Sequence, residues 1–156
     1  SPYAAIGLVA VYVAFRCGRR AFPLFLDRAR IRASRVYDLV LDTNAICDAS
    51  ATVGRFLGTR RGMDDRKSGL VSLLIEETLM LVKDRNAGRR THAEISVGWS
   101  NGITVVIRDD GKLFDITDAD STASSLRSYL VANLMVAIPA RRNMTTTGFN
   151  RNMFKL

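Results

Sequence analysis

The alternation of hydrophobic and polar residues predicts two neighbouring strands in the middle of the chain. From residue 93 to 99 a hydrophobic residue occupies every second position, and the same period continues from 103 to 107. A period of two is typical of a β-strand with one buried face. Asn101 and Gly102 separate the two runs, and this pair favours the type I′ turn of a two-residue hairpin loop. We therefore predict an antiparallel hairpin in this region.

A second pattern, with hydrophobic residues three and four positions apart, predicts helices on both sides of the hairpin. The longest is predicted over residues 70–83, which are apolar almost all round, and it should stop near residues 86–88. A shorter helix is predicted over 45–57, where the preceding polar residues can cap its first turn. A third is predicted over 124–136 from the same period, and Pro139 should end it.

Three more strands complete the predicted sheet. Residues 36–41 alternate imperfectly, and residues 144–147 and 149–156 form two extended pieces around Gly148. With the helices, this order predicts an α+β fold. We expect a two-layer α/β sandwich in which a mostly antiparallel sheet carries the helices on one face.

The first part of the chain has a different pattern. Residues 2–15 carry no charge, and three arginines follow within five residues. This run is shorter than the roughly 20 residues that span a membrane, but the arginines are typical of the cytoplasmic end of a membrane helix. We predict that residues 1–20 are the end of a truncated transmembrane helix, that 21–35 are a basic connector, and that 36–156 fold at the cytoplasmic face of the membrane. The alternative is a helix that packs on the domain or on a second copy, forming a homodimer.

The charge distribution limits the classes of partner. The net charge is +8, but the first 36 residues contain seven arginines and a single aspartate, so most of the basicity lies at one end. A nucleic-acid-binding domain would need a basic face across its folded part, so we predict no nucleic-acid partner. Cys17, Cys47 and His92 lack the spacing of metal ligands, and no metal site is predicted.

Two acidic motifs supply candidate chemistry. Glu77 shares a helical stripe with four leucines, whereas Glu76 is about 100° away, where we expect water to reach it. These four leucines are Leu70, Leu73, Leu74 and Leu81. Asp109 and Gly111 follow the second hairpin strand, where a glycine lets a ligand or another chain approach the backbone. The alternatives are an arginine partner for Glu77 at the helix edge and an ordinary polar turn at residues 109–111.

These motifs resemble those of a known family. Residues 75–79 (IEETL) and 107–115 (IRDDGKLFD) are similar to two motifs of the histidine-kinase-like ATPase domain, which sensor kinases, gyrase, Hsp90 and anti-sigma-factor serine kinases share. The resemblance covers residues 36–156 and is closest to the compact anti-sigma-factor type. It implies a domain that binds ATP or ADP.

The resemblance implies roles for individual residues. Glu77 would orient or deprotonate the attacking nucleophile, and Asp109 would accept a hydrogen bond from the adenine amino group. Gly111 would let the base approach, and Phe114 belongs to the same motif. Ser125 could cap a helix and leave backbone amides free for the phosphates.

Two departures from the family change the expected function. Leu81 stands where the family has an asparagine that coordinates Mg²⁺, and leucine cannot ligate a hard cation. Because of Leu81, Mg²⁺ is not expected. Residues 123–127 (ASSLR) also lack the Gly-x-Gly that cradles phosphates in the family. The principal hypothesis is a degenerate nucleotide-binding domain that acts as a sensor or regulatory module of a membrane protein, with a protein partner that the sequence does not identify.

Two alternatives stay open. One is an active Mg-ATP-dependent serine kinase or ATPase, and the other is an interaction scaffold without a nucleotide. If a nucleotide binds, Glu77 and Asp109 should face one cavity between the long helix and the sheet.

Overall fold

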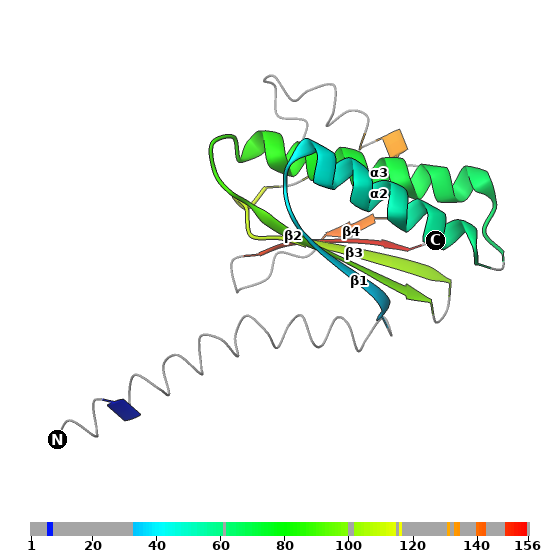
Figure 1. Cartoon of the computed structure of the whole chain (residues 1–156), viewed down its shortest axis with the longest axis horizontal. Coiled ribbons are helices and arrows are strands. Elements are labelled where there is room, and N and C mark those ends of the chain that lie inside the picture. The colour runs from blue at the N-terminus through cyan, green and yellow to red at the C-terminus, as the bar shows by residue number, and fades with distance from the viewer. Residues whose placement is uncertain are drawn as a thin grey trace.

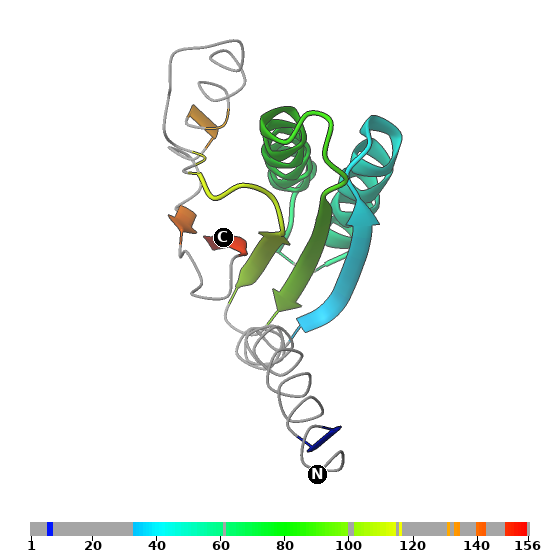
Figure 2. The ribbon, with the colours of Figure 1, turned by 90° about the vertical axis from the view of Figure 1, so that its left-hand side faces the viewer.

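A computed structural model of the chain contains a five-stranded sheet with two long helices on one of its faces (Figure 1; Figure 2). The residues that the structure describes are 6–7, 33–60, 62–99, 102–114, 116, 131, 133–134, 140–142 and 149–155. All strand pairs are antiparallel. The predicted α+β class and two-layer sandwich are confirmed.

The sheet has the strand order β1-β2-β3-β5-β4. Its strands are β1 (Ala33–Val40), β2 (His92–Trp99), β3 (Ile103–Asp109), β4 (Ala140–Arg142) and β5 (Asn150–Lys155). The helices are α2 (Thr43–Gly58) and α3 (Asp65–Arg85). Figure 2 shows both helices on the same side of the sheet, with α2 towards β1.

Both helices begin where an aspartate caps the first turn. The side chain of Asp42 accepts a hydrogen bond from the backbone N–H of Ala45 at 2.9 Å, and Asp64 accepts one from the backbone N–H of Lys67 at 2.6 Å. These caps satisfy donors that the first turn of a helix leaves unpaired. The predicted helices over 45–57 and 70–83 are confirmed.

The hairpin is confirmed, but its loop is one residue longer than predicted. Trp99 pairs with Ile103, so three residues separate the last pair. Three-residue loops commonly place a glycine in the left-handed region, and Gly102 has a φ of +88°. The register decides the pairing along both strands, and Glu94 stands opposite Arg108. A two-residue loop would have set Glu94 opposite Asp109, an unfavourable pair of like charges.

The ends of the sheet differ from the prediction in detail. β1 begins at Ala33 instead of residue 36, so the last residues of the predicted connector belong to the sheet. β5 is confirmed, and it pairs with β4 at residues 140–142. The predicted strand 144–147 lies outside the described residues, as does most of the predicted helix 124–136.

The core lies between the helices and the sheet. α2 contributes Ile46, Val53 and Leu57, and the central strands contribute Ile95, Val105 and Ile107, all with no more than 1% of their surface exposed. The face of the sheet opposite the helices is also buried along β2 and β3, since Ser96 and Val106 are 3% and 1% exposed. The domain therefore positions polar residues inside the sheet as well as at its ends.

No helix among the described residues is long and apolar enough to cross a membrane. The predicted membrane segment at residues 1–20 lies outside the described residues, apart from Ile6 and Gly7. Residues 21–32 of the predicted connector also lie outside them.

Candidate functional site

A cluster of polar side chains closes the end of β3. Asp109 is 1% exposed, and its Oδ1 accepts hydrogen bonds from Asn150 Nδ2 at 2.7 Å and from the backbone N–H of Gly111 at 3.0 Å. Side chains alternate along a strand, and Ile107, two residues earlier, belongs to the core beneath the helices. The Asp109 carboxylate therefore lies on the helix-facing side of the sheet, as predicted for a strand-end acceptor.

Asn150 connects this carboxylate to the loop that follows β3. Its Nδ2 also donates to the backbone carbonyl of Lys112 at 2.9 Å, and its Oδ1 accepts from the backbone N–H of Phe114 at 3.3 Å. One side-chain amide thus binds β5, β3 and the loop together. The sequence motif contained the carboxylate but not this partner, which comes from the far end of the chain.

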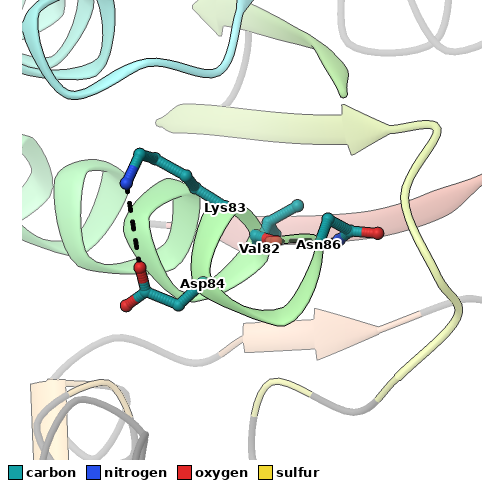
Figure 3. Close-up of polar contacts among 4 residues, drawn as sticks. All are labelled: Val82, Lys83, Asp84 and Asn86. Carbon is teal, nitrogen blue, oxygen red and sulfur yellow. Dashed lines mark hydrogen bonds and ion pairs between the residues drawn. The ribbon is translucent and has the colours of Figure 1, made fainter. Parts of the chain in front are cut away.

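Asn86 holds the same loop from the other side. Its Nδ2 donates to the carbonyl of Val82 at 2.8 Å (Figure 3), and its Oδ1 accepts from the backbone N–H of Lys112 at 2.9 Å. A Cβ at Gly111 would lie 2.5 Å from Asn86 Nδ2. The close neighbour that requires a glycine at 111 is therefore a residue of the same chain, where the sequence had suggested a ligand.

Phe114 packs beside the end of α3. It is half-buried, and the guanidinium carbon of Arg85 lies 5.2 Å from the centre of its ring. This distance is within the range of a cation–π contact. The Phe114 ring and the backbone N–H of Lys112 thus both hold the loop after β3 against the end of α3. Ser125 and residues 123–127 lie outside the described residues.

Both glutamates of α3 are half-buried. Glu76 is partly open to water, as predicted, but it also contacts α2, which packs along this side of α3. Its Oε2 accepts a hydrogen bond from Ser50 Oγ at 3.2 Å, and the Cys47 thiol is 3.8 Å from its Oε1.

The leucines that defined the predicted stripe do not behave alike. Leu74 and Leu81 are fully buried, whereas Leu73 is 45% exposed, so Glu77 lies at the boundary of the buried face. Leu81, which the resemblance had placed at a metal-ligand position, is a fully buried hydrocarbon and offers no oxygen for Mg²⁺. No group of three or more acidic, cysteine or histidine residues in the described part of the chain could hold a metal.

Two cavities lie near this cluster. The loop after α3, with Lys83, Arg89 and Arg90, lines one of about 370 Å³. Another, of about 180 Å³, is lined by residues of β1, β2 and β3 that include Asp109. Glu77 lines neither cavity. A shared cavity for Glu77 and Asp109 therefore stays a prediction.

A row of charged residues crosses the other face of the sheet. Asp38, Glu94, Arg108 and Arg151 stand opposite one another on β1, β2, β3 and β5. Glu94 is 9% exposed, and both arginines are 4% exposed. Sequence reasoning missed this row because it assigned the polar positions of the hairpin to the solvent side. The available signal, once the loop length is known, was that Glu94 and Arg108 stand opposite each other with opposite charges on the two strands of the hairpin.

Comparison with known proteins adds no assignment. No model of a known protein family matches this chain, and no curated protein matches its sequence. The candidate site therefore depends on the geometry of the described residues and on the resemblance of the two motifs.

Proposed function

We propose that this domain binds an adenine nucleotide near the end of β3 and acts as a regulatory module without Mg²⁺-dependent catalysis. The observation that carries the proposal is the Asp109 carboxylate, which is 1% exposed and is held through Oδ1 by Asn150 and Gly111. A carboxylate that is fixed inside a protein is a strong and directional acceptor.

The chemistry of this carboxylate favours adenine over guanine. The exocyclic amino group of adenine can donate to a carboxylate, whereas the corresponding position of guanine is a carbonyl that would face it with like partial charge. A site with a buried polar group rejects an analogue that leaves that group unpaired. Asp109 would therefore select the base, and the phosphates would contribute little to the choice.

Binding without turnover follows from the surroundings of α3. Phosphoryl transfer relies on positioning and on neutralising charge at the phosphates, usually with Mg²⁺. Leu81 is fully buried and apolar at the position where a metal ligand would be needed. Glu77 alone could orient a nucleophile, but it would lack the metal that makes the phosphate reactive.

The regulatory part of the proposal comes from the first part of the sequence. An uncharged run at residues 2–15 precedes an arginine-rich stretch, a pattern typical of the cytoplasmic end of a membrane helix. A nucleotide-binding domain joined to such a helix would report nucleotide levels to a membrane protein. The protein partner stays unidentified.

Thermal unfolding with ATP and with ADP, each with and without Mg²⁺, tests the proposed binding. A ligand at 100 times its dissociation constant stabilises the folded state by roughly 2.7 kcal/mol. We expect ATP and ADP to raise the unfolding temperature equally well with EDTA and with Mg²⁺, and we expect no release of phosphate. Stabilisation that needs Mg²⁺, together with phosphate release, would instead identify an active enzyme.

A nucleotide-free scaffold is the second candidate. The contact that favours it is the close approach of Asn86 to Gly111, where an added Cβ would be 2.5 Å from Asn86 Nδ2. This packing explains the glycine of the motif without a ligand. The same unfolding experiment separates the two candidates, because a scaffold would unfold at one temperature with and without nucleotide.

A further inference from the structure

Asn152, in the middle of β5, carries a buried side-chain amide. It is 2% exposed, and neither its Nδ2 nor its Oδ1 has a hydrogen-bond partner among the described residues. A side-chain amide offers two donors and an acceptor with two lone pairs. Proteins satisfy the large majority of such buried groups, and an exception calls for an explanation.

The position of Asn152 links it to the candidate site. On β5, Asn150 pairs with Asp109 and Asn152 pairs with Ile107. Residues two apart on a strand share a face and lie about 7 Å from each other. Since Ile107 and Phe154 both belong to the core beneath the helices, Asn152 faces the same side as Asp109. The two polar residues therefore lie along one helix-facing surface.

A second polar group without a partner comes from the helix layer. Thr78 on α3 is fully buried, and its hydroxyl has no hydrogen-bond partner within the described part of the chain. Threonine inside a helix usually bonds the carbonyl one turn earlier. The helix and the sheet thus each bury a polar group that has no hydrogen-bond partner among the described residues.

The chemistry of the amide indicates which ligand would satisfy it. An asparagine amide forms two hydrogen bonds with adenine, in which the nitrogen donates to a ring nitrogen and the oxygen accepts from the amino group. We propose that Asn152 contacts the base of the bound nucleotide in this way and determines specificity for adenine together with Asp109. This inference rests on the proposed function, because it names a base contact in the same site.

Asn152→Val tests the contact, because valine suits a strand and removes both polar atoms. Calorimetric titration in EDTA compares ATP with inorganic tripolyphosphate, which carries the phosphates without the base. We expect the affinity for ATP to fall at least about tenfold, as for the loss of a two-bond base contact. The affinity for tripolyphosphate should not change, and the unfolding temperature of the nucleotide-free protein should not fall.

A second variant and a control keep the outcome clear. Asn152→Ala avoids any crowding by the valine methyl groups and should show the same loss of ATP affinity. Gly69→Ala, on an exposed part of α3 where an added Cβ meets nothing within 4 Å, should bind ATP as the unchanged chain does.

Three results would overturn the inference, and they differ in meaning. If the unchanged chain binds no ATP, the proposed function fails and the base contact fails with it. If the unchanged chain binds ATP and both Asn152 variants bind it equally well, the base contact alone is wrong. If Asn152→Val lowers the unfolding temperature as much as Asn150→Val does, the amide is already satisfied inside the protein, and it is not available for a base.

Discussion

Asn150 and Asn152 lie two residues apart on the same face of β5 and are 1% and 2% exposed, yet their surroundings differ. The amide of Asn150 donates to Asp109 and to the carbonyl of Lys112, and it accepts from the backbone N–H of Phe114. Neither polar atom of Asn152 has a partner among the described residues. The strand end is thus a region where the buried amide is hydrogen-bonded, and the strand interior is one where the buried amide has no partner among the described residues.

The difference separates a structural role for Asn150 from the recognition role that is proposed for Asn152. A satisfied buried amide contributes to stability, and its removal leaves the groups that it bonded without partners. An unsatisfied buried amide lowers stability and is tolerated where it serves another purpose. We therefore expect changes at Asn150 to affect mainly folding and changes at Asn152 to affect mainly binding.

The largest loss of stability is expected for Asn150→Val. The change removes a donor to the buried Asp109 carboxylate and leaves a carbonyl and an N–H of the loop without their partner. Losing a hydrogen bond to a charged group and leaving two backbone groups without partners together cost roughly 3 kcal/mol or more. Urea unfolding measures the free energy. A loss below about 1 kcal/mol would show that the strand-end cluster does not hold the loop.

Gly111→Ala should come next, at roughly 1 to 3 kcal/mol of destabilisation. The added Cβ would lie 2.5 Å from Asn86 Nδ2 and 3.0 Å from Asp109 Oδ1. Combining Gly111→Ala with Asn86→Ala should make the two costs non-additive, because the smaller residue at 86 removes the close contact. Gly69→Ala is the matched control and should stabilise the helix by up to about 1 kcal/mol. Strict additivity of the double variant would contradict the contact.

A smaller effect of opposite sign is expected for Asn152→Val. Replacing an unsatisfied buried amide by a hydrocarbon of comparable size should raise the free energy of unfolding by about 1 kcal/mol. For a chain of this length the unfolding temperature would rise by roughly 2 to 4 °C. Urea unfolding of both variants compares their free energies of unfolding. If Asn150→Val and Asn152→Val lose equal amounts, the two regions do not differ.

The smallest effect concerns Cys47 on α2, whose thiol contacts Glu76 on α3. Burial raises the pKa of its thiol above the ordinary value of 9.0, and the negative charge of Glu76 raises it further. Because the folded state favours the protonated thiol, this group lowers the stability as the pH rises past about 9. Glu76→Gln should lower the pKa of Cys47 but not restore it fully, since burial is the larger cause.

The measurement for Cys47 is the rate of alkylation between about pH 7 and 10, in a Cys17→Ser background so that a single thiol reacts. The thiolate is the reactive form, so the midpoint of the rate profile reports the pKa. An unchanged midpoint in Glu76→Gln would show that the glutamate does not act on the thiol.

The periodic parts of the fold could be predicted from the sequence. The hairpin, both long helices and the polar cap of α2 follow from local patterns, and the helix-facing position of Asp109 was also expected. The predicted length of the hairpin loop was wrong. Asn101 and Gly102 favour a two-residue turn, but the three-residue loop depends on pairing across the whole sheet. The additional loop residue sets the register that places Glu94 opposite Arg108.

The candidate site was harder to predict because its members are far apart along the chain. Asp109 and Gly111 lie in one motif, but Asn86 ends a helix and Asn150 begins the last strand. No local pattern marks an asparagine as a partner of a distant carboxylate. The contacts of Glu76 with Ser50 and Cys47 could not be predicted for a similar reason, since they depend on where α2 packs against α3.

The proposal that the Asp109 carboxylate selects adenine is tested by titrating ATP and GTP into the unchanged chain and into Asp109→Asn. The exchange keeps the size of the side chain but turns one oxygen into a donor. We predict that the unchanged chain prefers ATP and that Asp109→Asn loses affinity for ATP at least about tenfold while its affinity for GTP changes little or rises. Equal losses for both nucleotides would contradict the claim and place the base elsewhere.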